Sequence, residues 1–128
     1  MEKLEEKIKK YLEERGWDNL RPSDIAKSIV IEGGELLELF QWENPSLEEV
    51  KRNKEKMKEI EKELADVLIY ALDMSVLLGL NTEKIIHNKL AHIAKKYSAE
   101  LMRKNNDREP GTDSEYLRIK KEYRKRGL

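Results

Sequence analysis

Two pairs of acidic residues carry the clearest potential for chemistry in this sequence: Glu32 with Glu35, and Glu63 with Asp66. Each pair has i, i+3 spacing, which places two carboxylates on one face of a helix, where like charges destabilise it. Basic residues are absent from residues 28–42 and from residues 63–83, although the 128 residues include 26 Lys and Arg. Carboxylates on such apolar helices need a counter-charge, and a divalent metal ion is the natural one.

The two helices that carry these pairs must pack against each other for the carboxylates to act together. If they are antiparallel, four carboxylates converge inside a bundle and form a hard-oxygen site suited to Mg²⁺ or Mn²⁺. The two histidines, His87 and His92, lie on a later helix, which argues against a histidine-rich zinc site or a di-iron bundle. One acidic pair alone would be an ordinary charged helix surface, but two pairs without nearby bases favour a metal site.

The composition excludes several classes of protein. Acidic and basic residues balance at 26 each, so no net field attracts nucleic acid or a membrane surface. The chain has no cysteine, which excludes a disulfide framework and a cysteine zinc site. Residues 1–10 lack the apolar core of a signal peptide, and the apolar stretch 67–80 is too short to span a bilayer. We expect a soluble, cytoplasmic protein of one domain.

The spacing of apolar residues predicts helices throughout, and no stretch alternates like a strand. Capping signals divide the pattern: Ser23 is the expected N-cap of the second helix, Ser46 with Glu49 forms a capping box, and Asn53 marks a break. The fold class is therefore all-α, a four-helix-bundle-like arrangement with an extra C-terminal helix. The expected helices cover residues 2–15, 23–43, 46–78, 82–104 and a short segment after a capping box of Thr112 with Glu115.

We expect residues 1–104 to form the helical catalytic domain. Residues 105–128 would be a loop and a C-terminal helix packed on the same domain through Tyr116, Ile119 and Tyr123. The run 64–78 is more apolar than a small monomeric bundle needs, so we expect a homodimer or homotetramer that buries it. Asp73 lies in this run on the face of Asp66, and we interpret it as a residue that pairs across a dimer interface.

The runs Glu32-Gly-Gly-Glu-Leu-Leu-Glu-Leu-Phe-Gln-Trp42 and Glu63-Leu-Ala-Asp-Val-Leu-Ile-Tyr70 make the chain recognisable. They resemble the MazG-like all-α nucleoside triphosphate pyrophosphohydrolases, whose pattern is Glu-x-x-Glu, a spacer, then Glu-x-x-Asp. Both runs, together with the upstream dipeptide Gly16-Trp17, are most similar to the dCTP pyrophosphatase branch. The resemblance extends over about residues 11–97.

The resemblance implies a MazG fold and Mg²⁺-dependent hydrolysis of (deoxy)nucleoside triphosphates to monophosphate and pyrophosphate, which cleanses the nucleotide pool. A triphosphate is an anion, so carboxylates reach it through a metal ion, and Glu35 or Glu38 could orient or deprotonate the attacking water. By position, the implied metal ligands are Glu32, Glu35, Glu63 and Asp66, the residues at the base are Trp17, Trp42 and Tyr70, and those near the phosphates are Lys89, Lys96 and Tyr97.

Two positions depart from the family pattern and leave alternatives open. Ile93 stands where relatives often have Asn, and Ser98 where they often have Pro, so the preference for a base does not transfer. One alternative is another branch of the superfamily, with dUTPase-like or phosphoribosyl-ATP pyrophosphohydrolase activity. The other is a non-catalytic helical module for dimerisation or regulation.

Overall fold

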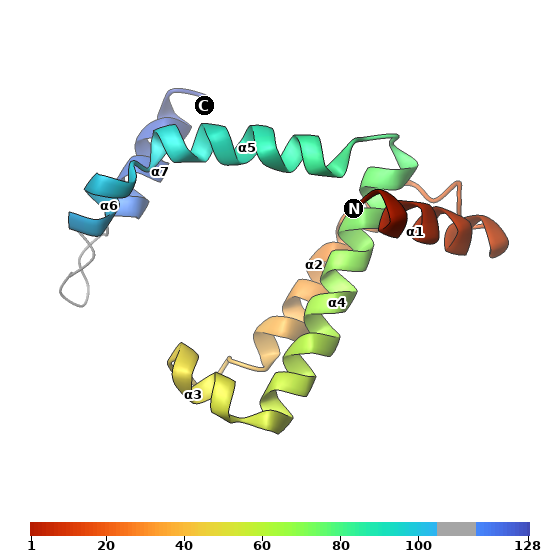
Figure 1. Ribbon diagram of the computed structural model, residues 1–128, viewed down its shortest axis with the longest axis horizontal. Coiled ribbons are helices and arrows are strands. Elements are labelled where there is room, and N and C mark those ends of the chain that lie inside the picture. Colours follow the sequence, from red (N-terminus) through yellow and green to blue (C-terminus); the bar gives the residue numbers. More distant parts are fainter. Residues whose placement is uncertain (105–114) are drawn as a thin grey trace. The chain divides into compact units, whose positions relative to one another are not determined.

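The computed structural model describes residues 1–104 and 115–128, and every regular element in these ranges is an α-helix (Figure 1). This confirms the all-α class. The chain divides into two compact units, Met1–Thr82 and Glu83–Leu128. The helices are α1 (Glu2–Glu14), α2 (Pro22–Glu38), α3 (Leu47–Arg52), α4 (Lys54–Leu77), α5 (Thr82–Lys96), α6 (Ala99–Lys104) and α7 (Glu115–Lys125).

In the first unit, α2 and α4 lie side by side and run in opposite directions, and α1 packs against α4 (Figure 1). The amphipathic face of α1 buries Ile8 and Leu12, while α2 contributes Ile25. Gly16 follows α1 with φ +69°, a left-handed conformation that glycine adopts without strain. In this turn the Trp17 amide donates a hydrogen bond to the Leu12 carbonyl at 2.9 Å. This bond fixes the position of Trp17 at the end of α1.

The ends of α2 differ from the prediction. Arg21, with extended backbone, precedes Pro22 at the first position, so Ser23 lies inside the first turn and is not the N-cap. Proline suits this position because its missing N–H would have no intrahelical partner. The helix ends at Glu38 and not near Glu43. Just after this end, the Lys56 ammonium donates a hydrogen bond to the Leu39 carbonyl. That carbonyl would otherwise accept the next helical hydrogen bond.

The junction between α3 and α4 follows the capping signals of the sequence. Ser46 Oγ accepts a hydrogen bond from the Glu49 amide at 3.2 Å, and Asn53 Oδ1 accepts from the Lys56 amide at 3.1 Å. Each side chain satisfies a backbone donor that the first turn of a helix leaves unpaired. The predicted cap at Ser46 and the predicted break at Asn53 are confirmed, and together they turn the chain so that α4 returns along α2.

The burial of α4 differs from expectation. Within the part of the chain that the structure describes, its buried side chains are Asp73 and Ser75, whereas Leu64 and Leu68 are 42% and 52% exposed. Ser75 is paired, since its hydroxyl and that of Thr82 lie 2.5 Å apart. The apolar run is therefore not buried within the first unit.

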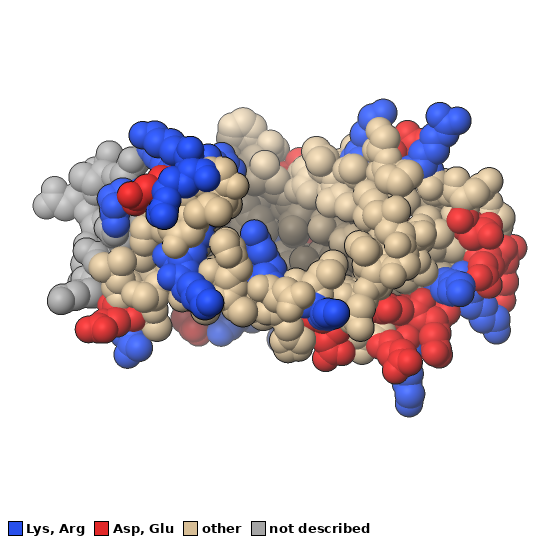
Figure 2. All heavy atoms as spheres, turned by 90° about the horizontal axis from the view of Figure 1, so that it is seen from above, with Lys and Arg blue, Asp and Glu red and all other residues tan. Residues whose placement is uncertain are grey.

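In the second unit, the expected helix up to residue 104 is interrupted. α5 ends at Lys96, and Ser98 Oγ accepts from the Leu101 amide at 3.2 Å and so begins α6. α7 buries Ile119 and places its tyrosines near residues of the same unit: the Tyr97 and Tyr116 rings are 4.8 Å apart, and those of His92 and Tyr123 6.2 Å. Lys and Arg side chains gather over this unit (Figure 2).

Two predicted features lie outside the described residues: the loop at 105–111 and the capping box of Thr112 with Glu115. The division into a catalytic domain of residues 1–104 and a packed segment of residues 105–128 stays a prediction. In the described ranges, no helix is both long and apolar enough to cross a membrane.

Candidate metal centre and adjoining pocket

The antiparallel packing of α2 and α4 brings the two acidic pairs together. Each of Glu32, Glu35, Glu63 and Asp66 offers one carboxylate oxygen, and these four atoms lie within 4.8 Å of one another. The i, i+3 spacing turns each pair to the face where its helix meets the other. The convergence that the sequence predicts is therefore present in the fold.

The protein compensates the charge of these carboxylates only in part: the charge of Lys62 lowers the pKa of Glu63, but less than burial raises it. Glu32 Oε2 and Glu63 Oε2 are buried and have no hydrogen-bond partner in the described chain. Across residues 1–104 and 115–128, none of the four side chains forms an ion pair with Lys or Arg. Buried carboxylate oxygens without a donor are costly, and oxygen-rich groups of this kind are the ligands that hard divalent cations prefer. The residues present thus fit a divalent metal ion.

The crowding of negative charges contributes to raised pKa values at two of these carboxylates, Glu35 and Glu63. The pKa of Glu35 is raised above its ordinary value, first by a hydrogen bond shared with Glu32 and then by the negative charge of Glu32. The pKa of Glu63 is raised by burial and next by the charge of Glu35. Without a cation, each carboxylate makes ionisation of its neighbour less favourable.

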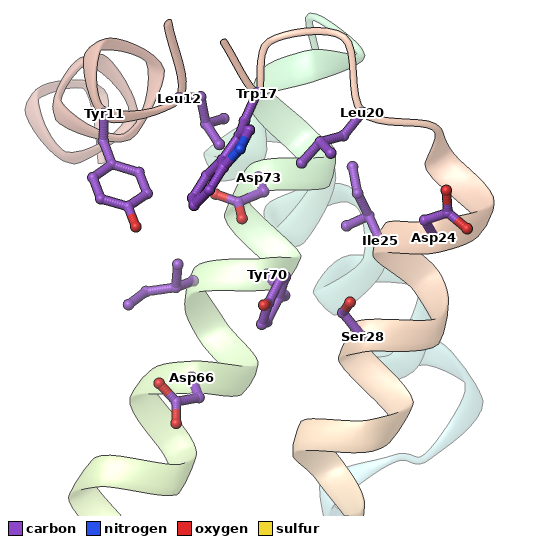
Figure 3. Close-up of a pocket in the computed structure, with 11 residues that line it drawn as sticks. Tyr11, Leu12, Trp17, Leu20, Asp24, Ile25, Ser28, Asp66, Tyr70 and Asp73 are labelled. Atoms are coloured by element: carbon purple, nitrogen blue, oxygen red, sulfur yellow. The ribbon is translucent and has the colours of Figure 1, made fainter. Parts of the chain in front are cut away.

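A pocket of about 390 Å³ adjoins this group and shares Asp66 with it (Figure 3). This volume falls in the range of small-molecule sites. Trp17 enters from the loop after α1, and Tyr70 and Asp73 follow Asp66 along α4. The remaining lining residues are Tyr11, Leu12, Leu20, Asp24, Ile25, Ser28 and Ile69.

The other residues singled out from the sequence lie apart from this pocket or in the second unit. Glu38 is exposed at the end of α2, and its charge contributes to raising the pKa of Glu35. Trp42 is 87% exposed and does not line the pocket. Lys89 and Lys96 belong to α5 and Tyr97 follows it, so all three are part of the second unit.

Sequence reasoning missed the role of Asp73 as a pocket residue. Its side chain is 4% exposed and lines the pocket, whereas the sequence analysis placed it on the face of Asp66 but interpreted it as a residue that pairs across a dimer interface. The signal was the spacing, because residues 66, 70 and 73 lie on one face of a helix. Tyr11 and Leu20 were also missed, since nothing local shows that α1 and the following loop close this side of α2 and α4.

Comparison with known proteins agrees with this geometry. The MazG-like family model matches residues 27–109. The chain is similar to the crystal structure of a pyrophosphatase from Archaeoglobus fulgidus DSM 4304, with 36% sequence identity and a TM-score of 0.67. The match covers 77% of this chain and 92% of that one. Comparison with curated proteins gives no match. The family model covers both acidic pairs and most of the helices that hold them, and the chain therefore belongs to the MazG-like family.

Proposed function

We propose that this protein is a divalent-metal-dependent hydrolase that converts (deoxy)nucleoside triphosphates to monophosphate and pyrophosphate and so cleanses the nucleotide pool. Membership of the MazG-like family and the similarity to a pyrophosphatase support pyrophosphatase chemistry in general. One observation carries the finer proposal: four carboxylates converge beside a pocket that has aromatic walls.

The metal would be Mg²⁺ or Mn²⁺, held by Glu32, Glu35, Glu63 and Asp66. Such an ion bridges phosphate oxygens and neutralises the charge that develops on them. Two of the four side chains bring buried oxygens that have no other partner in the described chain, which supports this assignment over a purely structural acidic cluster.

The neighbouring side chains have roles that follow from their chemistry. Glu35, or Glu38 one turn later, would orient or deprotonate the attacking water. Trp17 and Tyr70 offer ring faces in the pocket, and stacking on a base contributes roughly 1–3 kcal/mol. Residues outside the pocket keep their proposed roles as further contacts to the substrate: Trp42 near the base, and Lys89, Lys96 and Tyr97 near the phosphates.

The test is incubation of the purified protein with a panel of (d)NTPs, with Mg²⁺, with Mn²⁺ or with EDTA, and separation of products by ion exchange. We expect metal-dependent release of monophosphate and pyrophosphate in equal amounts, and loss of this release in Glu63→Gln. Glu61→Gln changes an exposed acid on the same helix and should retain activity. Release of orthophosphate in place of pyrophosphate would contradict the proposed reaction. No turnover by folded, metal-loaded protein would contradict it as well and favour a non-catalytic helical module.

We further propose that the chain assembles as a homodimer or a homotetramer through apolar faces of α2 and α4. In the described residues, the buried hydrophobic side chains are few: Ile8, Leu12, Ile25 and Ile119. Val30 and Ile31 on α2 are 74% and 60% exposed, and Leu64 and Leu68 on α4 are also exposed. Exposed apolar surface on this scale is typical of protein–protein interfaces, and a second copy would bury the residues that the sequence predicts to be inside.

A further inference from the structure

Asp73 is the one acidic side chain of the described pocket lining that is buried, and it lies away from the candidate metal centre. It follows Asp66 by seven residues, which corresponds to roughly 10 Å along the helix axis. Only 4% of Asp73 is exposed, and its Oδ1 has no hydrogen-bond partner in the described chain. Buried polar atoms are almost always paired, so this oxygen is an acceptor that the described part of the chain does not satisfy.

The surroundings of Asp73 define what could satisfy it. Tyr11, Leu12 and Trp17 line the same pocket, and no Lys, Arg or His is among its described lining residues. Figure 3 shows the Asp73 carboxylate and the Trp17 ring in the lining of one pocket, with Tyr70 one turn below Asp73 on α4. None of the N–H and O–H groups of the described lining is paired with Oδ1, so an N–H or O–H donor on a ligand that fits between the aromatic rings can satisfy it.

We infer that Asp73 determines base specificity by accepting a hydrogen bond from the exocyclic amino group of a nucleobase that enters this pocket. The inference rests on the proposed function and narrows it to a substrate class, the triphosphates whose base carries an amino group. A carbonyl oxygen at the same position would face the carboxylate oxygen with lone pair against lone pair. A site built to pair with a donor discriminates strongly against analogues without it, because the buried group is then left unpaired.

Cytosine and uracil are the matched pair for a test, since they share a ring size and differ in the amino or carbonyl group. Assays belong at mildly alkaline pH, because burial raises the pKa of Asp73 and the ionised carboxylate is the discriminating form. With Mg²⁺, we expect kcat/KM for dCTP to exceed that for dUTP by about tenfold or more.

In Asp73→Asn the amide can rotate to present its NH₂ to a carbonyl oxygen. We expect the ratio of kcat/KM for dCTP to that for dUTP to fall about tenfold or more, chiefly through KM, with turnover of dUTP retained as proof of folding. Asp18→Asn, an exposed acid outside the pocket lining, should leave this ratio as it is in the wild type. Equal ratios in wild type and Asp73→Asn, or no preference in the wild type, would overturn the inference while the proposed function stands.

Calorimetric titration with dCMP and dUMP tests the inference without turnover. We expect the wild type to bind dCMP more tightly, and Asp73→Asn to lose or reverse that preference. Equal binding of both nucleotides, or binding of neither, would overturn it. If the wild type hydrolyses no triphosphate but retains the dCMP preference, the proposed reaction fails and the assignment of Asp73 stands.

Discussion

Glu35 lies between the carboxylates of Glu32 and Glu63, and its pKa is raised by that proximity. Glu35→Gln removes one negative charge from the group, so the metal-free protein should become more stable, with a higher Tm. The same change removes a metal ligand and should weaken Mg²⁺ binding by about tenfold or more. Thermal denaturation in EDTA and in increasing MgCl₂ measures both effects, because a ligand that binds the folded state raises Tm.

Glu61→Gln is the control for this experiment, since Glu61 is an exposed acid on the same helix. Its Tm should rise with Mg²⁺ as in the wild type. A Glu35→Gln protein whose Tm responds to Mg²⁺ like that of the wild type would rule Glu35 out as a ligand.

Asp73 makes a separate prediction about pH. Burial raises its pKa above the ordinary 3.8, so above pH 3.8 the folded protein holds this proton more tightly than the unfolded chain. The stability that the proton contributes is present at low pH and is lost as pH rises through the folded pKa. Asp73→Asn cannot lose a proton, so the free energy of unfolding of this variant should increase relative to that of the wild type as pH rises over this window.

Urea denaturation of both proteins in EDTA, across a pH series, gives this difference directly. The raised pKa values of Glu35 and Glu63 affect both proteins alike and cancel. A difference that stays constant with pH would show that Asp73 has the same pKa in the folded and unfolded chain.

At the level of elements, Gly33 and Gly34 lie within α2, between the first two candidate ligands. An added Cβ at either position would meet no atom within 4 Å in the described chain. Glycine in a helix costs roughly 1 kcal/mol relative to alanine, so Gly34→Ala should raise the free energy of unfolding by up to about that amount. Chemical denaturation of dilute protein measures it.

Gly79→Ala provides the opposite case. Gly79 follows α4 with φ +67°, where a Cβ is strained, so this change should lower stability by roughly 1 kcal/mol. If Gly34→Ala lowered stability as well, another molecule would have to lie against the backbone there, and a second copy of the chain would be the first candidate.

The sequence predicts the helices well where a side chain caps them. Ser46 and Asn53 begin α3 and α4 as their types indicate, and Ser98 caps α6 by the same chemistry, although its signal was not recognised. The predicted end of α2 near Glu43 was wrong. At the actual end of the helix, the Leu39 carbonyl accepts a hydrogen bond from the Lys56 ammonium, which is 17 residues further along the chain. No local pattern shows such a contact.

In the candidate site too, the features set by local spacing could be predicted from the sequence, and the features set by contacts between distant segments could not. Spacing within a helix is sufficient to place Glu32 with Glu35 and Glu63 with Asp66, and the balance of charges suggests that a cation joins them. The pocket depends on segments that meet only after folding: α1, the loop that follows it, and the facing sides of α2 and α4. Hence Trp17 was placed by resemblance, and Asp73 was placed on the face of Asp66 without being recognised as part of a pocket.

At the scale of the whole molecule, the exposed leucines of α4 are the basis of the proposed assembly. Leu64 and Leu68 are one turn apart and both exposed. Leu68→Glu should convert the oligomer to a monomer, because a carboxylate buried at an apolar interface is strongly destabilising. Light scattering coupled to gel filtration measures the mass, and Tm of the wild type should rise with protein concentration.

Leu47→Glu is the matched control, since Leu47 on α3 is 76% exposed and lies outside the proposed interface. It should leave the mass unchanged. A wild-type protein that is monomeric at all concentrations tested would exclude the assembly, and Leu68→Glu would then have little effect.

The different surroundings of the two indoles have an optical consequence. Trp42 is 87% exposed, whereas Trp17 lines the pocket and lies edge-on to Tyr11, with ring centroids 6.0 Å apart. Trp42 should therefore emit like free indole in water when no nucleotide is bound. In a Trp42→Phe protein, Trp17 becomes the sole indole fluorophore, and its intensity and emission maximum would report the filling of the pocket by an unlabelled nucleotide in real time.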